Sequence, residues 1–165
     1  MTRQILKYPD KRLKQHSKEV ETFDETLHIL LDDMYDTMQD SGGIGLAAIQ
    51  VGVPLCALII ELDDEDGNKI SELIEAINPK ITSREGETKY KEGCLSVPEY
   101  YDEVTRSERV TVEYKDRHGN DMRLNAEGLL AIAFQHEIDH LNGKLFFERL
   151  SILKRKKFEK EYGKK

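Results

Sequence analysis

The chain has 165 residues with a formal net charge of −7, and hydrophobic residues make up 38% of it. This apolar share is too high for a disordered protein, and charged or helix-breaking residues interrupt every stretch long enough to span a membrane. The length suits one domain over residues 1–165, and the charged first residues lack the apolar core of a signal peptide. We therefore expect a cytoplasmic protein without membrane contacts.

The first third of the chain predicts one helix followed by extended structure. Thr22 and Glu25 form a capping-box pattern, and the apolar residues after it recur at helical spacing, which indicates a helix over residues 24–40. After the glycine-rich stretch 42–52, the apolar run over residues 55–60 is typical of a buried strand.

Strands dominate the middle of the chain. Residues 70–81, interrupted at Asn78-Pro79, and residues 87–91 have the composition of strands. Residues 109–115 place apolar side chains on alternate positions, and the hairpin-type turn that follows leads into residues 122–124. We therefore expect mostly antiparallel pairing.

The helical period returns over residues 127–142, and Gly143 stands where a helix terminator is expected. Because helices are segregated from mostly antiparallel strands, we expect an α+β fold in which the strands pack around this central helix. One further helix precedes the strands, and another is expected in the C-terminal tail.

This central helix contains His136-Glu137-Ile138-Asp139-His140, an H-E-x-x-H pattern. Residues four apart on a helix lie one above the other, so both imidazoles can reach one metal ion with Glu137 beside them. The alternative interpretation is a pair of core or surface histidines. A metal site requires a third ligand.

Several side chains are candidates for that ligand. Cys94 follows Gly93, which permits a close approach of the backbone, and this makes it the better candidate. Cys56 lies within the apolar run and is expected to be a core residue. One thiolate and two imidazoles would leave a fourth position for water, as in catalytic sites. The other candidates are the carboxylates, His16, His28 and His118.

The glycine-rich stretch 42–52 has two interpretations. It is either a flexible link between helix and strand or a functional segment, and it lacks the lysine and spacing of a phosphate-binding loop. Gln50 is its lone polar amide. If this amide is buried, it needs hydrogen-bond partners.

Three segments of the chain, residues 43–50, 92–96 and 136–140, together resemble the signature motifs of the bacterial peptide deformylases, in the same order. The resemblance extends over nearly the whole chain up to about Leu150. It implies an enzyme that hydrolyses the formyl group from the N-terminal formylmethionine of newly made peptides and releases formate. It also implies one divalent metal ion per chain, typically Fe²⁺ with Zn²⁺, Ni²⁺ or Co²⁺ as substitutes, and its ligands would be Cys94, His136 and His140.

The resemblance implies a task for further residues. Water bound to the metal would attack the formyl carbon, and Glu137 would take its proton and return it to the leaving amine. The Gln50 amide and the Leu95 backbone N–H would donate to the developing oxyanion. Residues expected to bind the N-formylmethionyl peptide are Ile44, Gly45, Gly93, Leu129, Ile132 and Ala133.

Two charged features of the sequence each have two interpretations. Arg106 could pair with Asp139 behind a metal ligand, as in similar enzymes, but we favour an ordinary surface charge. The tail, residues 151–165, carries seven basic and two acidic side chains, so its charge is +5 and that of the remaining chain is −12. We favour a solvated helix with Leu153, Phe158 and Tyr162 against the body. The alternative is contact with the ribosome through its phosphates.

Two other functions compete with deformylation. A zinc peptidase would share the H-E-x-x-H pattern, but the common ones recruit a downstream histidine or glutamate rather than a cysteine such as Cys94. A non-catalytic module of translation would hold a structural metal and tolerate Glu137→Gln. The acidic body argues against DNA binding, and nothing in the sequence demands a second subunit, so we expect a monomer.

Overall fold

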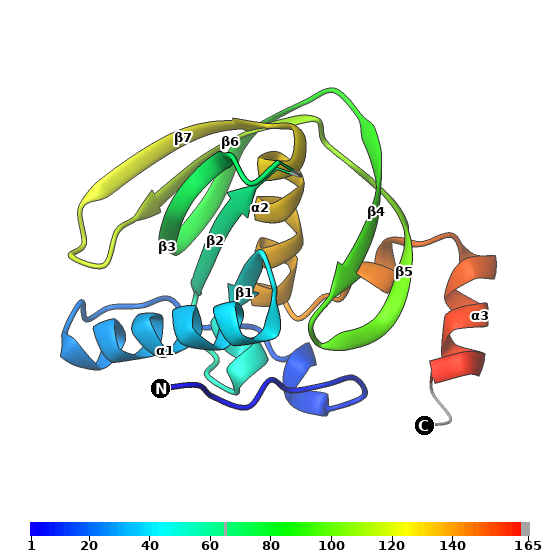
Figure 1. Cartoon of the computed structure of the whole chain (residues 1–165), viewed down its shortest axis with the longest axis horizontal. Helices are drawn as coiled ribbons and strands as arrows, with labels where there is room; N and C mark the ends of the chain where they lie inside the picture. The colour runs from blue at the N-terminus through cyan, green and yellow to red at the C-terminus, as the bar shows by residue number, and fades with distance from the viewer. Residues whose placement is uncertain (65, 163–165) are drawn as a thin grey trace.

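The structure of the protein is a computed structural model that describes residues 1–64 and 66–162 (Figure 1). Its strands are β1 (Gly45–Ala47), β2 (Ala57–Asp63), β3 (Lys69–Glu85), β4 (Thr88–Cys94), β5 (Val97–Arg106), β6 (Arg109–Lys115) and β7 (Asp121–Glu127). Its helices are α1 (Glu25–Ser41), α2 (Gly128–Leu141) and α3 (Ile152–Tyr162), with short 3-10 turns η1 (Lys11–Lys14), η2 (Ala48–Val51) and η3 (Phe146–Arg149). The expected α+β fold is confirmed.

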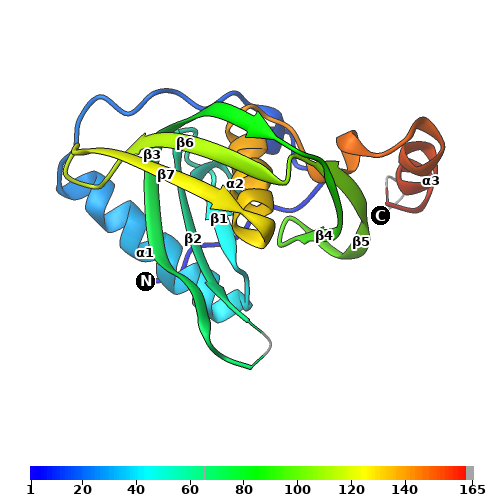
Figure 2. The same ribbon diagram turned by 90° about the horizontal axis from the view of Figure 1, so that it is seen from above.

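The strands form two antiparallel sheets. The larger has five strands in the order β1-β2-β3-β6-β7, and the smaller is the β4–β5 hairpin. Helix α2 lies between the five-stranded sheet and this hairpin (Figure 2). The strands therefore surround a central helix, as expected.

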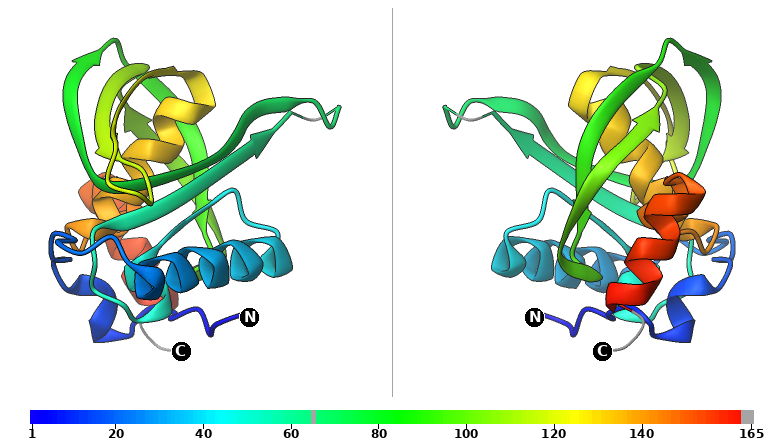
Figure 3. Two further views of the ribbon diagram at one scale, coloured as in Figure 1. Left: turned by 90° about the vertical axis from the view of Figure 1, so that its left-hand side faces the viewer. Right: turned by 90° about the vertical axis from the view of Figure 1, so that its right-hand side faces the viewer.

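Strand β2 is buried on both faces because a helix covers each of them (Figure 3). On one face Leu58 and Ile60 share a core with Phe134 of α2. On the other face Ile59 shares a core with Met34 of α1. Successive side chains of β2 point to opposite faces of the sheet, so this one strand packs against α2 on one face and α1 on the other.

Helix α1 begins and ends close to the expected positions. Its N-cap is Asp24, whose side chain accepts a hydrogen bond from the Leu27 N–H at 3.2 Å, so the capping box predicted at Thr22 is wrong. It ends at Gly42, which has a φ of 71°. The left-handed conformation there favours glycine and turns the chain toward β1.

Two strands differ from the sequence prediction. Strand β3 continues through Asn78, where the pairing register shifts and φ is 52°. The Asn78 amide exchanges two hydrogen bonds, of 2.8 and 2.9 Å, with the backbone of Val20, so the predicted interruption is a bulge. Strand β5 was not predicted, because its charged and tyrosine-rich sequence has no clear apolar alternation.

The C-terminal tail forms the expected helix, α3. Phe158 is fully buried and stacks on Phe147 with ring centroids 4.1 Å apart, whereas Leu153 is 82% exposed and does not pack against the body as predicted. The side chain of Tyr162 and residues 163–165 lie outside the described part of the chain. Among the helices described, none has both the length and the apolar character that crossing a bilayer requires.

Candidate metal centre and active site

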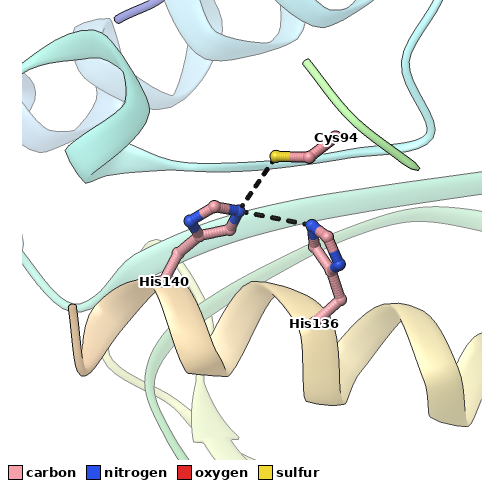
Figure 4. Close-up of side chains that lie close together, drawn as sticks. All are labelled: Cys94, His136 and His140. Atoms are coloured by element: carbon pink, nitrogen blue, oxygen red, sulfur yellow. Dashed lines mark hydrogen bonds between the residues drawn. The ribbon is translucent and has the colours of Figure 1, made fainter. Parts of the chain in front are cut away.

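Three side chains that can ligate a metal meet beside helix α2 (Figure 4). The Cys94 Sγ lies 3.3 Å from the His140 Nε2, which in turn lies 3.3 Å from the His136 Nε2. Their ligand atoms all fall within 4.8 Å of one another. The structure thus brings together the three residues that the sequence singled out.

Local geometry explains this convergence. Both histidines belong to α2, where the i, i+4 spacing aligns their rings along one side of the helix. Cys94 ends β4, and it pairs with Val97 across a two-residue turn after a shift in register. This shift and turn direct the end of the hairpin at the helix.

The donor set fits a small divalent ion. Tetrahedral coordination with usual metal–nitrogen and metal–sulfur bond lengths requires donor atoms about 3.3–3.6 Å apart. The two separations of 3.3 Å, from the His140 Nε2 to the Cys94 Sγ and to the His136 Nε2, fall at the lower end of this range. Neighbouring Glu137 Oε1 is buried and has no hydrogen-bond partner among the described residues, so the site also offers an unsatisfied acceptor beside the ligands.

The ionisation of two buried groups also suits this chemistry. Burial and the neighbouring His136 hold the pKa of His140 well below its usual value, so its ring is neutral and its nitrogen can act as a ligand. Burial raises the pKa of Glu137 to about 7. A carboxyl group with this pKa can both take and give a proton near neutral pH.

A buried ionic network stands behind the histidines. Glu92 accepts a hydrogen bond of 2.9 Å from the His136 Nδ1, which leaves the Nε2 to face the cluster. Arg106 donates two hydrogen bonds to Glu92 and one of 2.6 Å to Asp139. Arg149 donates two more to Asp139.

This network corrects one prediction and adds two residues. Arg106 is 6% exposed, so the favoured interpretation as a surface charge is wrong and its pairing with Asp139 is confirmed. Sequence reasoning missed Glu92, although its position in the motif around Cys94 was a usable signal. It also missed Arg149, for which the sequence offers no signal.

Gln50 has the partners that its burial demands. Its Oε1 accepts a hydrogen bond of 2.9 Å from the Ala47 N–H. Its Nε2 lies 3.1 Å from the Ser96 Oγ and 3.6 Å from the Cys94 Sγ. The glycine-rich stretch is therefore not a flexible link, because it forms β1 and η2 and directs an amide at the cluster.

The cluster opens into a cavity of about 520 Å³. This volume is within the usual range for a small-molecule or peptide side-chain site. Sequence reasoning missed several of its lining residues, among them Ile5, Lys7, Tyr90 and Tyr101. His140 is fully buried and does not line the cavity. The predicted site residues other than the three candidate ligands line it, namely Ile44, Gly45, Gln50, Gly93, Leu95, Leu129, Ile132, Ala133 and Glu137.

At two of these lining residues a side chain would displace a neighbouring side chain. A Cβ atom on Gly45 would lie 2.6 Å from the Glu137 Oε2. A Cβ atom on Gly93 would overlap the ring of Tyr101. The backbone therefore forms part of the cavity wall at both points.

The other candidate ligands lie elsewhere. Cys56 is partly buried, its thiol donates to the Ser17 carbonyl, and burial together with Glu19 raises its pKa. His28 and His118 contact each other, with ring centroids 5.2 Å apart. Within the described residues, only the group at Cys94 brings three potential ligands together.

Comparisons with known proteins show which family this chain resembles. The family model for polypeptide deformylase matches residues 2–156. The chain is 57% identical to the peptide deformylase of Nautilia profundicola, over 97% of this chain and 92% of that one. It is 55% identical to that of Wolinella succinogenes, over 98% and 95%.

Solved structures give the same result. The peptide deformylase of Thermus thermophilus superposes with a TM-score of 0.90 at 40% identity, covering 99% of this chain and 95% of that one. The Met-Ala-Ser-bound peptide deformylase of Acinetobacter baumannii superposes with a TM-score of 0.86 at 30% identity, covering 91% and 99%.

Proposed function

Because this chain belongs to the polypeptide deformylase family, we propose that the cavity beside Cys94 is where it removes the formyl group from the N-terminus of newly made peptides. The single observation that supports this placement is the meeting of one thiol and two imidazoles next to a buried carboxyl group. Membership in a family of enzymes also argues against a non-catalytic translation module.

Cys94, His136 and His140 would hold one divalent ion per chain. Sulfur and nitrogen donors suit Fe²⁺, Co²⁺, Ni²⁺ and Zn²⁺, and the proposed native ion is Fe²⁺ with the others as substitutes. When bound, such an ion lowers the pKa of water and polarises a carbonyl oxygen. Glu92 would keep the His136 ring in the orientation that this binding requires.

Glu137 is the proposed proton carrier. Its carboxyl group is buried against the Gly45 backbone, and its pKa of about 7 suits both directions of transfer. It would accept a proton from the attacking water and deliver it to the amine nitrogen that leaves.

Gln50 and Leu95 are the proposed oxyanion donors. The Gln50 side chain is held at its Oε1 by Ala47, which leaves the Nε2 directed toward Cys94. The Leu95 backbone lies in the turn directly after Cys94. One such donor lowers the barrier by about 3–4 kcal/mol.

The cavity also suits the methionine and the peptide backbone of the substrate. Gly45 lies in β1, the edge strand of the large sheet, Gly93 lies in β4 of the hairpin, and both line the same cavity. An extended N-formylmethionyl peptide would pair with these two glycine-containing edges as an added strand. Its methionine side chain would enter the apolar part of the cavity, formed by Ile44, Leu129, Ile132 and Ala133.

The test is formate release from formyl-Met-Ala-Ser, run without oxygen on enzyme reconstituted separately with Fe²⁺, Ni²⁺ or Zn²⁺. We expect turnover by the wild type and by Glu127→Gln, a matched change at an exposed position. Glu137→Gln is expected to lose turnover and keep its metal, measured by elemental analysis. Cleavage of unformylated or internal peptide bonds instead would favour the zinc peptidase.

We further propose that the enzyme works in the cytoplasm as a monomer and approaches the ribosome through α3. Lys156, Lys157 and Lys160 are exposed and have no ion pair among the described residues. Changing these three lysines to glutamine keeps the buried Phe158 anchor. If α3 contacts ribosomal phosphates, cosedimentation with ribosomes should fall in the variant and fall with salt in the wild type. Equal cosedimentation would refute this contact.

A further inference from the structure

The cavity continues beyond the catalytic cluster along the N-terminal segment of the chain. Ile5, Lys7 and Ser41 line the cavity of about 520 Å³ and also a second cavity of about 450 Å³. The second cavity extends to Arg3 and Arg12. The two cavities therefore adjoin at this segment, and we refer to them together as the groove.

The segment is held firmly against the site. The Leu6 N–H donates to the carbonyl of Gln50 at 2.7 Å, and the Tyr8 N–H donates to the carbonyl of Ser96 at 2.8 Å. Figure 1 shows the segment passing below α1 and the tip of the β4–β5 hairpin. Residues of the N-terminus thus bond to the same two loops that carry the proposed oxyanion donors.

One edge of this segment has backbone donors without a partner among the described residues. At the start of this edge the Arg3 N–H donates to the Thr37 Oγ1 at 2.8 Å, so the donors in question are those of Ile5 and Lys7. Leu6 and Tyr8 use their N–H groups within the fold, and alternate residues of an extended chain direct theirs to the opposite edge. No hydrogen bond from the N–H of Ile5 or Lys7 occurs among the described residues. Two donors at this spacing match the carbonyl groups of an extended peptide.

The charge of the groove favours an acidic ligand. Lys7 and Lys91 line it without an ion pair among the described residues, whereas Arg3 and Arg12 are paired with carboxylates. Glu99 is the exposed carboxylate that opposes the two lysines. Lys7 is exposed where the two cavities meet, so a chain that follows the groove passes its ammonium group.

We propose that residues 5–7 bind the part of the substrate that follows its first residues, as an extended chain paired with the N–H groups of Ile5 and Lys7. We call residues 5–7 the track, and Lys7 makes it selective for nascent peptides with acidic side chains downstream of the methionine. This inference rests on the proposed function and names a preference within it.

The test compares formyl-Met-Ala-Ser with two formylated octapeptides that begin identically and continue with alternating Asp-Ala or alternating Lys-Ala. We expect the kcat/KM of the acidic octapeptide to exceed that of the basic one by about two- to fivefold, mainly through KM, as for an exposed ion pair. Lys7→Gln should bring this ratio to about one, and Lys7→Glu should invert it. Lys11→Gln, a matched change outside both cavities, should keep the wild-type ratio.

The outcomes separate this inference from the proposed function. Equal kcat/KM values for both octapeptides, or a ratio that Lys7→Glu does not change, would refute peptide binding along residues 5–7 and leave the proposed deformylation unaffected. Failure of the wild-type enzyme to release formate from the tripeptide would refute the proposed function itself, and the track with it.

Discussion

Gly45→Ala should displace the carboxyl group of Glu137 without removing it, so the loss of activity reports how much the position of this group matters. The added Cβ would lie 2.6 Å from the Glu137 Oε2 and 3.1 Å from its Cδ and Cγ, whereas ordinary contact begins at 3.4 Å. Glu137 is buried, so the carboxyl group must shift by about 0.8 Å to restore contact, and it must do so within a packed site. A displacement near 1 Å reduces catalysis on the order of 100-fold, equivalent to about 2.7 kcal/mol in the barrier.

The assay is kcat/KM for formate release, with metal content and the thermal midpoint measured on the same samples. Alanine is compatible with the β conformation of Gly45, so we expect the fold and the metal to be retained. Gly67→Ala is the control, since a Cβ there meets nothing within 4 Å, and it should lower stability only.

A double mutant makes the result decisive. If Gly45→Ala acts through Glu137, it should add little to the loss already caused by Glu137→Gln. Activity of Gly45→Ala within threefold of the wild type, or a full additional loss in the double mutant, would show that contact with Gly45 does not position the carboxyl group.

Three further changes test the surroundings of the site. Glu92→Gln should weaken metal binding about 10- to 100-fold, because it removes the charged partner of His136. Competition with a chelator measures this affinity, and an unchanged value would contradict the role of Glu92. Arg106→Ala removes the buried guanidinium that pairs with both Glu92 and Asp139 and should lower the free energy of unfolding by about 3–5 kcal/mol in denaturant titrations; a loss below 1 kcal/mol would contradict its role. Asn78→Ala removes both hydrogen bonds to Val20 and should cost about 2 kcal/mol in the same assay without changing kcat, whereas a change in kcat alone would be unexpected.

The sequence by itself determined those features that depend on local geometry. The spacing of His136 and His140 places both rings on one side of any α-helix, whatever surrounds it. The apolar stripe of α1 likewise predicted a buried face, which the structure confirms. The lone amide of Gln50 required buried partners, and it has them in Ala47 and Ser96.

Only the tertiary structure decided what long-range packing brings together. Cys94 meets His140 across 46 positions of the chain because the β4–β5 turn and α2 pack at one place, and no local pattern encodes that approach. The burial of Arg106 and the path of residues 5–7 beside the cavity have the same origin. Strand register and helix packing depend on the whole core, so neighbours distant in sequence become visible only when the fold is complete.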